Sequence, residues 1–67
     1  MMEKVYVVTN LDRGNVLSVW HDRDKAQQWA KSNVGDLESV SKRSILTFVY
    51  GRDKSLLITE TFVRDVV

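Results

Sequence analysis

The sequence predicts an α+β domain with one helix packed on one face of a four-stranded antiparallel sheet, in the order strand, strand, helix, strand, strand. Two observations lead to this class. Runs of β-branched and aromatic residues occur as two closely spaced pairs with turn-forming residues between them, and one segment with helical spacing separates the pairs. With 67 residues, the chain is expected to form a single domain over residues 1–67.

The first predicted hairpin joins residues 4–9 (KVYVVT) to residues 16–20 (VLSVW). The loop between them, residues 10–15, contains Asn, Asp and Gly, which tolerate turn conformations. A loop of this length places Thr9 opposite Val16 and fixes which side chains share a face.

A helix of about eleven residues is predicted next. Asp22 is a suitable N-cap, and Asp24 adds negative charge in the first turn, where the helix dipole favours it. Gly35 is suited to the left-handed position after the last turn. The apolar face of the helix consists of Ala26, Trp29 and Ala30.

The second predicted hairpin joins residues 45–50 (ILTFVY) to residues 55–63 (SLLITETFV), with Tyr50 opposite Ser55. The preceding segment, residues 37–44, is mostly polar. It is expected to be an irregular connection or a frayed lead-in to the next strand.

Both hairpins carry apolar side chains on both faces, whereas one short helix covers only one face. In the first hairpin, one face carries Val5, Val7, Val16 and Trp20, and the other carries Tyr6, Val8, Leu17 and Val19. Because Trp20 adjoins the start of the helix, its set is expected under the helix. The second set is then the expected partner-binding or dimer surface.

Two outcomes are open for the uncovered face. The segment 37–44 and the C-terminal residues Val66 and Val67 could fold over it. Otherwise the face binds another protein, or the chain forms a homodimer through stacked sheets or a joined sheet edge. The amount of apolar strand surface favours association.

Charge and composition argue against several classes of protein. Ten basic and nine acidic residues give a net charge of +1, unlike a strongly basic nucleic-acid binder or an acidic DNA mimic. There is no cysteine, no signal-peptide pattern and no long apolar run, so a cytoplasmic protein is expected.

Nucleic-acid binding is the alternative function. If the second hairpin is extended, Arg64 lies beside Ser41 and close to Lys42 and Arg43, which would form a basic cluster. A charged rim around a protein interface would look the same.

No catalytic, metal-binding or cofactor-binding group is predicted. His21 with Asp22 and Asp24 could resemble a metal site, but aspartates are expected at a helix start. Glu60 lies in a strand and could be a buried acid with a raised pKa, although a satisfied edge residue or an ion pair is favoured. No nucleophile motif or phosphate loop is present.

The segments KVYVVTN and VLSVWHDRDKAQQWA, within residues 4–30, resemble a family of small uncharacterised phage and bacterial proteins. The resemblance implies an origin in a phage or mobile element and a role as an inhibitor of host or defence machinery. It implies no catalytic residue. The expected function is therefore non-enzymatic binding of a host or anti-phage defence protein in the host cytoplasm, by a chain that forms homodimers.

Overall fold

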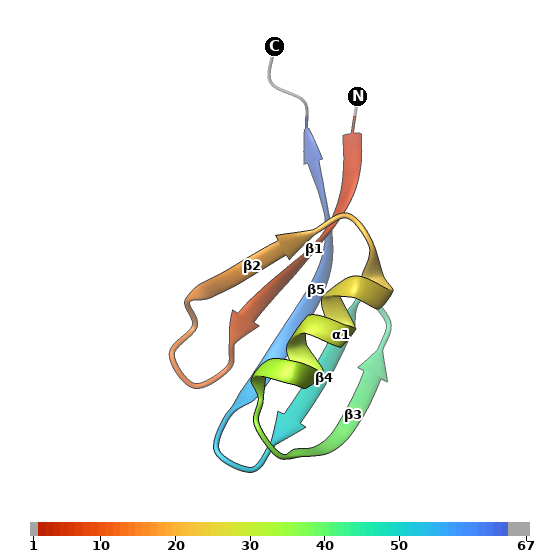
Figure 1. Cartoon of the computed structure of the whole chain (residues 1–67). Helices are drawn as coiled ribbons and strands as arrows, with labels where there is room; N and C mark the ends of the chain where they lie inside the picture. The colour runs from red at the N-terminus through yellow and green to blue at the C-terminus, as the bar shows by residue number, and fades with distance from the viewer. Residues whose placement is uncertain (1, 65–67) are drawn as a thin grey trace.

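The computed structural model describes residues 2–64, in which one helix lies against a five-stranded antiparallel sheet (Figure 1). The elements are β1 (Met2–Asn10), β2 (Val16–Trp20), α1 (Arg23–Asn33), β3 (Leu37–Arg43), β4 (Leu46–Gly51) and β5 (Ser55–Arg64). The strand order across the sheet is β2-β1-β5-β4-β3. The predicted α+β class is confirmed, but the sheet has five strands where four were predicted.

The additional strand is β3, in the segment expected to be irregular. It pairs with β4 from Leu37 opposite Gly51 to Arg43 opposite Leu46, and a two-residue turn joins the strands. Ser44 in this turn has a φ of 54°. The segment therefore extends the sheet at its edge and does not fold over its uncovered face. The expectation for Val66 and Val67 lies outside the described residues.

Strands β1 and β5 form the longest pair in the sheet. They are paired over nine positions, from Met2 opposite Arg64 to Asn10 opposite Leu56. The neighbouring strands are shorter, since β2 joins β1 only from Tyr6 onwards. The ends of β1 and β5 consequently project as a two-stranded ribbon, with Met2 and Arg64 side by side at its tip (Figure 1).

The register of the first hairpin differs from the predicted one because β2 contains a bulge. Thr9 lies opposite Val16, as predicted, but Leu17 is an extra residue without a partner, so Trp20 lies opposite Tyr6. Side chains alternate between the two faces along a strand, and one extra residue moves all later side chains to the other face. The bulge therefore places Trp20 on the same face as Tyr6.

The helix has the predicted ends and the predicted length of eleven residues. The Asp22 carboxylate accepts hydrogen bonds from the backbone N–H of Asp24 at 2.8 Å and of Lys25 at 3.3 Å. At the other end, the N–H of Val34 donates to the carbonyl of Ala30, and Gly35 has a φ of 81°. Local cap chemistry thus determines where the helix begins and ends.

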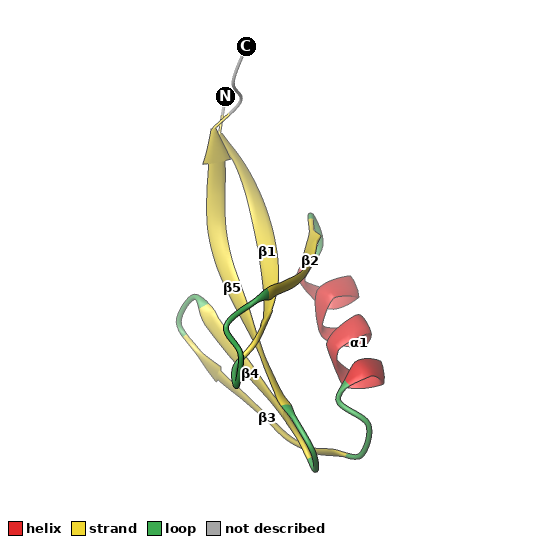
Figure 2. Ribbon diagram, turned by 90° about the vertical axis from the view of Figure 1, so that its left-hand side faces the viewer, coloured by secondary structure: helices red, strands yellow, loops and turns green. Residues whose placement is uncertain are grey.

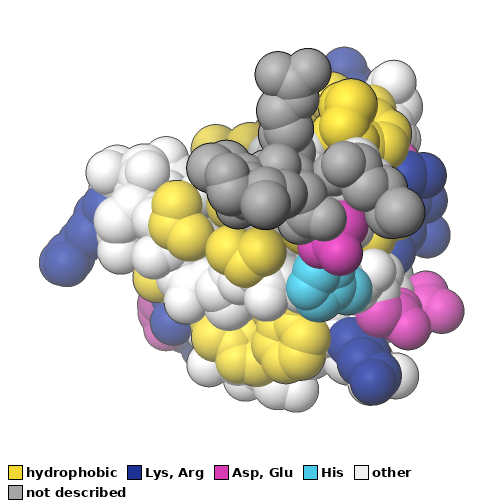
Figure 3. All heavy atoms as spheres, turned by 90° about the horizontal axis from the view of Figure 1, so that it is seen from above, with side chains coloured by type: hydrophobic (Ala, Val, Ile, Leu, Met, Phe, Trp, Pro, Cys, Tyr) yellow, Lys and Arg dark blue, Asp and Glu magenta, His cyan; other side chains and the backbone are white. Residues whose placement is uncertain are grey.

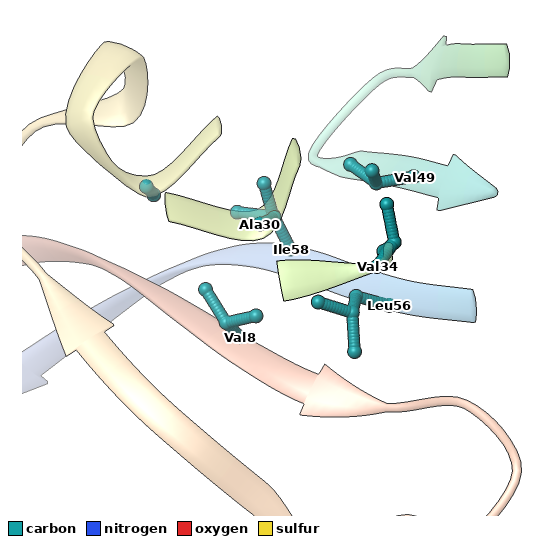
Figure 4. Close-up of a cluster of buried hydrophobic side chains, with 7 residues drawn as sticks. Val8, Ala30, Val34, Val49, Leu56 and Ile58 are labelled. Carbon is teal, nitrogen blue, oxygen red and sulfur yellow. The ribbon is translucent and has the colours of Figure 1, made fainter. Parts of the chain in front are cut away.

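The core lies between α1 and one face of the sheet (Figures 2 and 4). Its buried side chains are Val8, Ala26, Ala30, Val34, Val49, Leu56 and Ile58. Trp29, on the predicted apolar face of the helix, is only half-buried, and its ring lies 6.5 Å from that of Trp20 at the margin of the core. Gln27 is more deeply buried than Trp29.

Candidate protein-binding face

The open face is the face of the sheet that points away from α1, and Figure 2 shows it without a covering element in the described chain. Successive side chains of a strand point to opposite faces, so the strand residues that alternate with the buried core residues have their side chains on the open face. The apolar ones are Val5, Val7, Val16, Val19, Leu46, Phe48, Tyr50 and Leu57, with Val63 on the projecting ribbon. They come from four strands, so the sheet brings together residues from both predicted hairpins.

Apart from Val5, which is buried, these apolar side chains are partly or largely accessible to solvent. Val16 is 60% exposed and Val19 is 55% exposed. The Phe48 and Tyr50 rings stack on each other with centroids 6.0 Å apart and an interplanar angle of 6°. The stack presents a flat aromatic surface beside the aliphatic side chains of the neighbouring strands.

The open face carries little charge. Among the regularly paired residues that the structure describes, the charged side chains of this face are Arg43 on β3 and Glu3 on the projecting ribbon, and the other polar side chains are serines and threonines such as Thr9 and Thr59. A surface that combines apolar, aromatic and hydroxyl side chains is typical of the centre of a protein interface, where charged residues are depleted.

The predicted partner-binding set is divided between the two faces. Val8 is fully buried in the core under α1, and Tyr6 is half-buried on the same side. Val19 lies on the open face, and Leu17 is 37% exposed at the bulge. The prediction is therefore wrong for Val8 and Tyr6, because the bulge that shifts the register of β2 is not recognisable from the sequence VLSVW.

Charged side chains gather on the other face, at the base of the projecting ribbon. The Glu60 carboxylate lies 2.9 Å from Lys4 Nζ and 2.7 Å from an Arg23 guanidinium nitrogen, and its side chain is 15% exposed. The guanidinium of Arg23 also lies over the Tyr6 ring, 5.5 Å from its centroid. This cluster links the first turn of α1 to both strands of the ribbon.

The electrostatics of this cluster correspond to an ion pair. The hydrogen bond from Lys4 is the main cause that lowers the pKa of Glu60 below its ordinary value, and the charges of Lys4 and Arg23 add to it. The same hydrogen bond raises the pKa of Lys4. The favoured ion-pair interpretation of Glu60 is confirmed, and a raised pKa suited to a general acid is not found.

His21 lies at the surface directly before the N-cap of the helix. Figure 3 shows this single histidine beside acidic side chains. Asp22 caps the helix with its carboxylate, and Asp24 lies in the first turn. In residues 2–64 no group of three His, Cys, Asp or Glu side chains is placed to hold a metal ion, and no pocket is present.

The basic residues predicted to cluster lie apart. The backbone of Arg64 pairs with Met2 at the far end of the ribbon, whereas Ser41 lies on the edge strand β3. Lys42 and Arg43 are consecutive in β3, so their side chains point to opposite faces of the sheet. The predicted proximity of Arg64 to Ser41 is wrong because β4 lies between β3 and β5 in the sheet.

Comparisons with family models, with curated proteins and with solved structures each found no match. No helix in the described part of the chain is long and apolar enough to cross a membrane. The functional interpretation therefore depends on the residues and their geometry.

Proposed function

We propose that this protein is a non-enzymatic protein-binding module whose contact surface is the open face. The observation that supports the proposal is a five-stranded sheet that has an apolar, almost uncharged face with no covering element in residues 2–64. Burial of one exposed valine, leucine or phenylalanine side chain contributes about 1.5 to 3 kcal/mol, so covering several of them would support stable association.

The dimensions of the open face are suitable for a small interface. Five strands about 4.8 Å apart, each contributing about five residues, give a surface of about 24 by 17 Å, or roughly 400 Å² in projection. The accessible area of such a surface is larger, and a standard interface buries about 800 Å² on each partner. A protein that covers a surface of this size would bind reversibly, through a flat apolar contact with a polar margin.

The biological role that we propose is stoichiometric inhibition of a host or defence protein by a phage-encoded chain, without a cofactor. This part of the proposal rests on the resemblance of residues 4–30 to small phage and bacterial proteins. A binding module needs an accessible surface and no reactive group, and the open face meets that requirement.

A charge placed on the open face tests the proposal. Val19→Glu puts a carboxylate at a position that is already 55% exposed, so the isolated domain should keep its fold. Gln28→Glu, at an exposed position of α1, is the matched control. Tagged wild type and both variants are used to capture proteins from bacterial lysates, with quantitative mass spectrometry as the measurement.

We expect a protein captured in stoichiometric amount by the wild type and by Gln28→Glu, and lost with Val19→Glu. Thermal melts of both variants should match that of the wild type. Equal capture by the two variants would show that the open face is not the contact surface.

A further inference from the structure

The outer edge of the sheet at β3 has the features of a strand-pairing surface. β3 is paired with β4 on one side only, and Figure 1 shows no other element of the described chain along its outer side. An edge strand presents a row of backbone N–H and C=O groups that can pair with a strand of another molecule. β3 is seven residues long and contains no proline.

The sequence of β3, LESVSKR, is complementary to itself in one antiparallel register. When two copies pair around a two-fold axis at Val40, Ser39 of each copy lies opposite Ser41 of the other, and Glu38, the bulged residue that precedes Ser39, falls across from Lys42. Opposite charges directly across a strand pair stabilise it, and the symmetry provides this ion pair twice. Among the described side chains, neither Glu38 nor Lys42 already takes part in an ion pair.

We propose that β3 pairs with β3 of a second copy of this chain, forming a homodimer with one continuous ten-stranded sheet. Antiparallel pairing of two edges requires a two-fold axis perpendicular to the sheet. Both helices then lie on one side, and the two open faces form one wider surface on the other side. The proposal of a dimer depends only on the edge strand β3. A role for the combined open faces in binding a partner rests on the proposed function.

The geometry of β3 favours this edge over the other one. The irregularity in β3 falls at Glu38, next to the end of the strand, and leaves residues 39–43 regularly paired with β4. The opposite edge strand, β2, has five residues with a bulge at Leu17 and no charged side chain to select a register. Both edge strands carry a bulge next to one end, but beyond it β2 keeps only residues 18–20 regularly paired, against residues 39–43 in β3, and short length protects an edge from pairing.

Charge reversal provides a specific test by sedimentation equilibrium at about 10 to 300 µM protein, a range suited to a small interface. Glu38→Lys and Lys42→Glu each place like charges opposite each other twice, so each should weaken the homodimer about 10- to 30-fold. An equimolar mixture of the two variants should form a heterodimer with the wild-type affinity, because every opposed pair is again Lys with Glu. The double variant should form a homodimer again, and Lys31→Glu on the helix should have no effect.

A wild-type chain that stays monomeric over the whole concentration range would overturn the proposal. A dimer that neither single reversal weakens, or a mixture of the variants that associates no better than its components, would also overturn it. Val19→Glu separates this proposal from the proposed function, because it should abolish capture of the protein partner while the homodimer remains. Loss of the dimer with Val19→Glu would instead indicate stacking of two open faces.

Discussion

Two neighbouring leucines in β5 test the assignment of the two sheet faces. Leu56 is fully buried between α1 and the sheet, whereas Leu57 is half-buried on the open face. Leucine-to-alanine substitutions in a closed core cost about 2 to 5 kcal/mol, since the lost transfer energy is increased by the cavity that remains. We therefore expect Leu56→Ala to cost about 3 to 4 kcal/mol, and Leu57→Ala about 1 kcal/mol in the isolated chain.

Urea denaturation followed by tryptophan fluorescence would measure both costs, because Trp20 and Trp29 pack against the core. A domain of this length has a total stability of about 3 to 10 kcal/mol, so Leu56→Ala should remove between about a third of that stability and all of it. The two substitutions remove the same atoms from adjacent positions of one strand. Equal losses, or a larger loss for Leu57→Ala, would refute the assignment of the faces.

Two further predictions concern a charge and a close contact. The pKa of Glu60 is lowered in the folded chain from an ordinary value of 4.5. The contribution of the Glu60 carboxylate to the free energy of unfolding is therefore complete above that pH and is lost as the pH falls through the folded pKa. When the free energy of unfolding is measured as a function of decreasing pH, it should fall less for Glu60→Gln than for the wild type. A Cβ atom at Gly51 would lie 2.5 Å from the Val34 carbonyl oxygen, so Gly51→Ala should cost about 1 to 3 kcal/mol by overpacking, whereas Asp53→Ala in the adjacent exposed loop should leave the melting temperature unchanged.

The elements that sequence reasoning located well are those determined by local chemistry. The carboxylate of Asp22 and the left-handed conformation of Gly35 act within one turn of the helix ends, and both are recognisable from the sequence. The opposition of Tyr50 and Ser55 similarly follows from a short loop between two clear strands. Each of these features depends on residues that are close together in the chain.

The strand β3 was not predictable in the same way because an edge strand needs few apolar side chains. Leu37 and Val40 are its only apolar residues, and Leu37 is exposed. Backbone hydrogen bonds to β4 hold the strand in place, and backbone pairing does not require alternating apolar residues that could be recognised in the sequence. A polar segment beside a strong strand is therefore compatible with both a loop and an edge strand.

The candidate site was only partly predictable for a related reason. An excess of apolar strand surface is visible in the sequence and correctly indicates an uncovered face. The assignment of residues to that face depends on register, and a single bulge at Leu17 exchanges the two sets in β2. Val19 was assigned to the correct face, whereas Val8 in the partner strand was not. The two residues were predicted to share a face, but the bulge places Val19 opposite Val7 and so on the other face from Val8.

The size of the core links the fold to the proposed binding function. The buried cluster consists of two alanines, three valines, one leucine and one isoleucine, and the aromatic side chains near it are only half-buried. A chain of 67 residues without cysteine has no covalent means to compensate for so small a core. Any molecule that binds only the folded state stabilises it. Burial of the open face or pairing of β3 would therefore add to the folding free energy, and association would contribute to the stability of the domain as well as to its function.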